Sequence, residues 1–220
     1  MDGVGRLWEY PSLVAIESFG SESNNNYGQV QSVDIMDDFL LVVREKAVAL
    51  YDFEQTEEPA ALLSLDVASS SSAPLPSSYR CGCFGKGALE AQVIVAGGDQ
   101  LSTYIVPSLA PVSQARLKSK ITCITTSASG LIAYGCADGS IGVLNSTLSH
   151  VGFIREAHAF AVSSVCFSAS GDLLVSGSAG GTLLVLPRSE YQRSFPVGTF
   201  LFIIFSILVV YLAYKFNTYN

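Results

Sequence analysis

The sequence predicts an all-β fold, a β-propeller of about four and a half blades, followed by one C-terminal transmembrane helix. Three observations predict it: strand-like segments recur at a regular spacing, short turns separate the strands within each unit, and one long apolar run lies near the C-terminus. Of the 220 residues 14% are charged, against roughly 25% in an average soluble domain. The net charge of −7 argues against a nucleic-acid partner, because binding to phosphates needs a basic surface.

The repeat is visible as five strand-like segments with aromatic or apolar centres. These centres are 40 to 53 residues apart, which is close to the blade spacing of WD-type propellers. The widest gap contains a Ser/Pro-rich stretch, residues 68–78, which we predict to be a loop between two blades. The predicted propeller covers residues 1–190. The five centres are Trp8, Tyr51, Tyr104, Leu144 and Val185.

Each unit alternates short strands with Gly-containing turns. Residues 162–187 read as strand, Ser-Gly-Asp turn, strand, Gly-Gly turn and strand, and residues 121–145 follow the same order. The spacing of Val162, Val165 and Phe167 suits half-buried antiparallel strands. The unit therefore predicts an antiparallel meander, as in a propeller blade.

Four residues match structural positions of WD repeats. Asp138 and Asp99 occupy tight turns where WD repeats place an aspartate, and Trp8 lies on the third strand of the first unit. His158 lies where a WD repeat places a histidine between blades; it could be a catalytic base, but its spacing to the next strand favours a structural hydrogen-bonding role. In the last unit Gly180 takes the aspartate position, so we expect side-chain support to be missing there.

The first unit looks incomplete. Residues 1–8 read as the turn and third strand of a blade whose first two strands are absent. Folded proteins avoid unpaired sheet edges. We therefore expect either that another copy supplies the missing strands or that the chain is the C-terminal part of a longer propeller of seven blades; the second reading is favoured.

No motif of bond-making or bond-breaking chemistry is present. The sequence lacks a G-x-S-x-G elbow, a G-x-x-x-x-G-K phosphate loop and an H-x-x-x-H pair. The five cysteines include one C-x-C pair, Cys81 and Cys83, without a second pair or a nearby histidine, so buried reduced thiols are favoured over a metal site. We predict no catalytic residue, no cofactor, no metal and no small-molecule substrate.

The apolar run at residues 197–214 has the length and composition of a transmembrane helix. It contains no charge over about 18 residues, which is close to the length that crosses about 30 Å of hydrocarbon. A buried helix of a soluble core is the alternative, but little sequence follows that could cover it. The residues that represent the span are Val197, Phe200, Ile203, Ile204, Leu208, Val210 and Tyr214.

The charges that flank the run predict its orientation. Arg188 and Arg193 precede it, and Lys215 alone follows it. Because positive charge is concentrated on the cytoplasmic side of membrane spans, we expect the propeller to be cytosolic. Residues 191–196 are then a juxtamembrane linker, and residues 215–220 form a short lumenal tail.

Three stretches together resemble a known family. They are DGVGRLWEYPSL at residues 2–13, REAHAFAVSSVCF at residues 155–167 and LLVLPRSEYQRSFPV at residues 183–197. They are similar to the ER-membrane WD-repeat family of the prolactin regulatory element-binding protein, in which a cytosolic propeller precedes a membrane span. The resemblance runs through the whole chain; its most specific part is a last blade that passes within ten residues into a terminal span.

The resemblance implies a guanine-nucleotide exchange factor. Members of this family act on the Sar-type small GTPase and thereby start COPII coat assembly at the ER, so the implied partners are that GTPase and the ER membrane. The family's active loop belongs to an early blade, so no residue of this chain is matched to it. The alternatives are a tail-anchored scaffold without exchange activity and an adaptor of the mitochondrial outer membrane.

Overall fold

Five antiparallel sheets make up the fold. The structure is a computed structural model that describes residues 5–9, 14–19, 27–52, 60–64 and 76–192, the first two ranges by their backbone alone. Within these ranges the secondary structure is almost entirely strand. The strands are β1 (Gly5–Glu9), β2 (Val14–Phe19), β3 (Val30–Met36), β4 (Phe39–Arg44), β5 (Ala47–Asp52), β6 (Ala61–Ser64), β7 (Cys81–Phe84), β8 (Gln92–Gly97), β9 (Gln100–Ile105), β10 (Ala110–Arg116), β11 (Ile121–Thr126), β12 (Ile132–Cys136), β13 (Ile141–Leu144), β14 (His150–Ile154), β15 (Val162–Phe167), β16 (Leu173–Ser178) and β17 (Leu183–Pro187).

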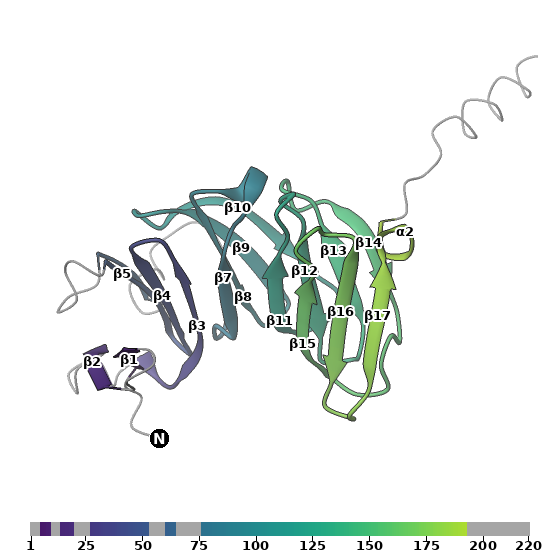
Figure 1. The fold of residues 1–220 in the computed structure, drawn as a ribbon, viewed down its shortest axis with the longest axis horizontal. Coiled ribbons are helices and arrows are strands. Elements are labelled where there is room, and N and C mark those ends of the chain that lie inside the picture. Colours follow the sequence, from purple (N-terminus) through teal and green to yellow (C-terminus); the bar gives the residue numbers. More distant parts are fainter. Residues whose placement is uncertain (1–4, 10–13, 20–26, 53–59, 65–75, 193–220) are drawn as a thin grey trace, which may run out of the picture.

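Strands adjacent in sequence are adjacent in each sheet. β3–β6, β7–β10 and β11–β14 are four-stranded meanders, β15–β17 has three strands, and β1 and β2 form a hairpin. The sheets follow one another along an arc (Figure 1), in which the first strands β3, β7, β11 and β15 pack side by side. This is the arrangement of propeller blades: four blades preceded by a two-stranded hairpin.

The repeat read from the sequence coincides with one position in the blades. Tyr51, Tyr104, Leu144 and Val185 lie on β5, β9, β13 and β17, the third strand of each blade, and Trp8 lies on β1. The spacing of these centres therefore measures the distance along the chain from one blade to the next. Most of the Ser/Pro-rich stretch 68–78 lies outside the described residues.

The hydrophobic core lies between the blades. Because successive side chains of a strand point to opposite faces, each blade contributes to two clusters. On β12, Ile132 and Tyr134 pack toward the blade β7–β10, whereas Ala133 packs toward β15–β17. On β4, Leu41 and Val43 likewise pack with residues of β8 and β9. The apolar residues are thus buried on both faces of the inner blades, which holds the arc together.

Side chains on the first strands bind the backbone of neighbouring first strands. Ser32 Oγ donates to the Gly82 carbonyl at 3.1 Å, and the Phe84 N–H donates to Asp34 Oδ2 at 2.8 Å. One blade further on, Thr126 Oγ1 donates to the Phe84 carbonyl at 2.9 Å. These bonds satisfy backbone groups at sheet edges where no strand pairs, and they fix each blade against the next.

The last blade ends in one helical turn, α2 (Arg188–Tyr191). Tyr191 is buried, its ring meets Phe167 edge to face at 5.8 Å, and its hydroxyl donates to the Gly171 carbonyl. The predicted transmembrane helix at 197–214 lies outside the described residues. Among the residues that the structure does describe, no helix has the length and apolar character of a membrane span.

Candidate functional site

The connections between blades share one backbone contact. Each connection leaves the fourth strand of one blade and enters the first strand of the next. One N–H group of the connection donates to a carbonyl of the blade that it leaves, in the turn between the second and third strands. The bonds run from Tyr79 to Glu45 at 2.8 Å, from Leu117 to Asp99 at 2.7 Å and from His158 to Gly139 at 3.0 Å. The turn of one blade therefore positions the entry into the next blade.

His158 adds a side-chain network to this contact. Its ring is buried, with Nε2 2.8 Å from Ser176 Oγ and Nδ1 2.7 Å from Thr182 Oγ1. Leu117, which makes the same backbone bond one blade earlier, has an apolar side chain. With both ring nitrogens engaged, His158 is a structural element between blades rather than a free catalytic base. The sequence indicated this histidine but not its two hydroxyl partners.

The turn between β16 and β17 has a polar support that the sequence did not predict. A Cβ at Gly180 would lie 2.6 Å from the Phe160 ring, so an aspartate there would displace that ring. The support comes instead from Thr182, whose hydroxyl bonds His158. The expectation that this turn lacks side-chain support is therefore wrong, because a residue two positions later supplies it.

Asp138 organises the turn between β12 and β13. Its Oδ1 accepts hydrogen bonds from the Ser140 N–H at 3.0 Å and from Ser140 Oγ at 2.6 Å. The hydrogen bond from the Ser140 hydroxyl holds the pKa of Asp138 below its usual value. The carboxylate therefore stays ionised and closes the turn from within.

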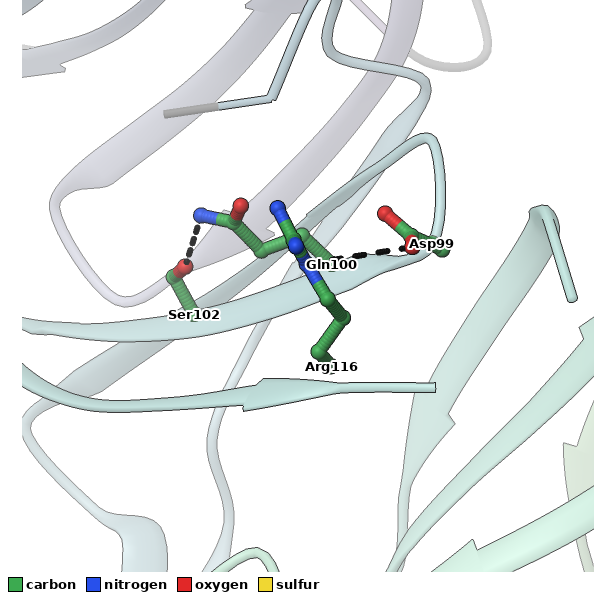
Figure 2. A network of polar contacts seen from close by, with 4 residues as sticks. All are labelled: Asp99, Gln100, Ser102 and Arg116. Atoms are coloured by element: carbon green, nitrogen blue, oxygen red, sulfur yellow. Dashed lines mark hydrogen bonds and ion pairs between the residues drawn. The ribbon is translucent and has the colours of Figure 1, made fainter. Parts of the chain in front are cut away.

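Asp99 takes the corresponding turn between β8 and β9. Figure 2 shows its carboxylate facing Arg116 of β10, with Oδ2 3.8 Å from Nε. Both side chains are at least half exposed, and pairs of this kind contribute about 1 kcal/mol or less. In the same view Gln100 Nε2 donates to Ser102 Oγ at 3.4 Å. Asp99 therefore holds the next blade mainly through its carbonyl, which accepts from Leu117.

The other predicted positions are Trp8 and the residues of the membrane span. Trp8 lies on β1, where it pairs with Ala15 of β2 next to a register shift. The span residues from Val197 to Tyr214 lie outside the described residues.

Cys81 and Cys136 are buried, and Cys83 and Cys123 are partly buried. All five are free thiols, and Cys166 is the one that is exposed. Burial raises the pKa of Cys83 to about 12 and that of Cys136 to about 11, with a raised pKa for Cys81 and Cys123 as well. Because the thiolate is the reactive form, we expect these four thiols to react slowly at neutral pH.

We expect one fast-reacting thiol in the folded chain. DTNB at pH 7.5 should label Cys166 within minutes and leave the other four thiols unlabelled until urea unfolds the protein. The measurement is the released chromophore, counted before and after unfolding. Cys166→Ser should remove the fast phase; a fast phase that persists in this variant would contradict the burial of the other thiols.

One face of the last blade is apolar and open. Leu183, Val185 and Leu173 are 72%, 49% and 41% exposed, and the strand register places Cys166 on the same face as Val185. No charged residue of β15, β16 or β17 points to this side. The opposite face of β15–β17 packs against β11–β14, so the open face is the one on which a further blade packs in a closed propeller.

Comparison with known proteins agrees with the fold. Residues 149–185 match the family model described as "WD domain, G-beta repeat", which covers β14 to β16 and the first part of β17. No curated protein matches the sequence. Among solved structures, the computationally designed Ika4 protein is similar with a TM-score of 0.57 and 16% identity, over 73% of this chain and 91% of that one. Within the residues that the structure describes, the fold is all-β, with four propeller blades and almost no helix, and residues 149–185 carry a WD40 repeat.

Proposed function

We propose that this propeller belongs to a membrane-anchored guanine-nucleotide exchange factor that activates a Sar-type small GTPase and starts COPII vesicle formation at the ER. One observation carries the proposal: the WD repeat at 149–185 is followed within about a dozen residues by the apolar run at 197–214. The same order of elements distinguishes the family that the sequence resembles. The proposed propeller has seven blades, faces the cytosol and is held by a single span.

Exchange needs binding rather than bond chemistry. The exchange factor opens the nucleotide pocket of its partner, GDP leaves, and no bond forms to the exchange factor. His158 has both ring nitrogens engaged and four thiols are buried or partly buried, so these groups are structural. An anchor would place GDP release beside the membrane. We assign none of the described residues as the exchange loop.

The proposal is tested by GDP release. A Sar-type GTPase loaded with fluorescent GDP is mixed with liposomes that carry the protein translated from its full open reading frame. We expect release to accelerate at least tenfold, while a small GTPase of another class, used as the control, is unaffected. No acceleration of the Sar-type GTPase would overturn the proposal.

The alternative is a tail-anchored WD-repeat scaffold without exchange activity. The propeller fold favours a role in protein contacts. A scaffold binds its partner equally in every nucleotide state, whereas an exchange factor binds the nucleotide-free GTPase most tightly. Affinities for the GDP-bound and nucleotide-free forms distinguish the two, and microscopy of a tagged chain separates the ER from the mitochondrial outer membrane.

A further inference from the structure

A hollow of about 140 Å³ opens where the connection between β10 and β11 passes over the blade β11–β14. Two of its lining residues belong to that connection and the others to β12 and β14. This volume is well below the roughly 300 Å³ at which small-molecule and cofactor sites begin, so it suits a single side chain. The lining residues are Lys118, Ser119, Tyr134, Cys136, His150 and Phe153.

The buried side of the hollow depends on one glycine. Tyr134 is 1% exposed and crosses the sheet over Gly142, where a Cβ would lie 2.1 Å from the Tyr134 Cζ. The register places Phe153 of β14 opposite the same glycine. Gly142 thus lets the Tyr134 ring lie along the sheet and reach the outer strand, where it lines a preformed apolar surface.

Two rings of β14 complete the apolar lining. The His150 ring meets Tyr134 edge to face at 6.3 Å and Phe153 at 6.4 Å between centroids. His150 is exposed, and Phe153 is 41% exposed. An apolar side chain that enters the hollow would therefore cover exposed surface of the His150 and Phe153 rings and rest against the edge of the buried Tyr134 ring.

The rim on the side of the connection is basic. Lys118 and Lys120 are exposed, and Arg116, two residues before Lys118, is paired with Asp99. The nearest acidic group, Asp138, keeps its negative charge; its carboxylate accepts hydrogen bonds from Ser140 and Ser119 and offsets one of the two lysines. The two lysines and Asp138 together leave one positive charge in excess beside an apolar hollow.

We propose that this hollow binds a short acidic peptide segment of a partner protein, which inserts one apolar side chain between Tyr134, His150 and Phe153. A carboxylate next to that side chain pairs with Lys118. Because the hollow holds a single side chain, the affinity is modest. It decreases as the salt concentration rises, because salt screens the contact between the carboxylate and Lys118. The site is independent of the exchange activity proposed above.

The test uses three fluorescein-labelled nonapeptides and fluorescence polarisation with the full chain in mild detergent. The first has a central leucine between glutamates, the second has alanine in place of leucine, and the third has lysines in place of glutamates. We expect the first to bind with a dissociation constant of roughly 0.1–1 mM and the other two about tenfold more weakly. Phe153→Ala should weaken the first peptide about tenfold.

Charge reversal gives the sharpest control. Lys118→Glu should weaken the acidic peptide about tenfold and strengthen the lysine peptide, whereas Lys46→Glu, at an exposed lysine on a distant blade, should change neither. Thermal melts verify that each variant is folded. The proposal is overturned if the three peptides bind alike, if none binds at millimolar concentration, or if Lys118→Glu behaves as Lys46→Glu does.

Discussion

Gly139→Ala is expected to lower the free energy of unfolding by about 3 kcal/mol or more, because two costs coincide at this turn. Gly139 has φ +81°, a left-handed conformation that costs other residues roughly 1–2 kcal/mol. A Cβ there would also lie 2.0 Å from the His158 carbonyl oxygen. To make room for this Cβ, the turn between β12 and β13 would have to move away from the connection that enters β15. This movement would break the hydrogen bond from the His158 N–H to the Gly139 carbonyl and loosen one blade from the next.

Gly181→Ala is the matched control for this effect. Gly181 has φ +76° in the equivalent turn of the last blade, and a Cβ there meets no atom within 4 Å. Gly181→Ala should lower the free energy of unfolding only by the cost of the left-handed conformation, about 1 kcal/mol. Urea unfolding followed by circular dichroism measures both variants. Equal losses in the two would show that the contact between the turn and the next connection contributes nothing.

Much of the fold could be predicted from local signals. The spacing of Tyr51, Tyr104 and Leu144 recurs because each residue occupies the third strand of its blade. Turn residues such as Asp138 mark strand ends because their side chains accept hydrogen bonds from backbone N–H groups nearby in the chain, here that of Ser140, two residues later. These features can be predicted from the sequence because they depend on residues close in the chain and not on contacts between blades.

The contacts between blades could not be predicted in the same way. The partner of the Leu117 N–H is a backbone carbonyl, which every residue has, so the sequence carries no mark of it. Thr182 replaces a turn aspartate because its hydroxyl reaches His158, a relation that depends on how the connection folds over the turn. The aromatic hollow likewise depends on the register that sets Tyr134 opposite Gly142. These features need the three-dimensional arrangement of two elements.

His158→Ala is expected to cost about 2 to 3 kcal/mol and to lower the melting temperature by roughly 5 to 10 °C. The substitution removes two ring hydrogen bonds and leaves the hydroxyl of Ser176, which is 1% exposed, without its histidine partner. It also leaves a cavity between two blades. Thermal unfolding of the full chain in mild detergent measures the loss. Ser176→Ala combined with His158→Ala should cost less than the sum of the two single changes, because they share one bond.

The other histidine provides the control that separates a structural from a chemical role. His150 is exposed, so His150→Ala should cost well under 1 kcal/mol. A structural His158 predicts that any activity of the protein falls in proportion to the unfolded fraction and returns at lower temperature. If His158→Ala unfolds at the same temperature as His150→Ala but abolishes activity, the ring acts on a substrate and the structural interpretation is wrong.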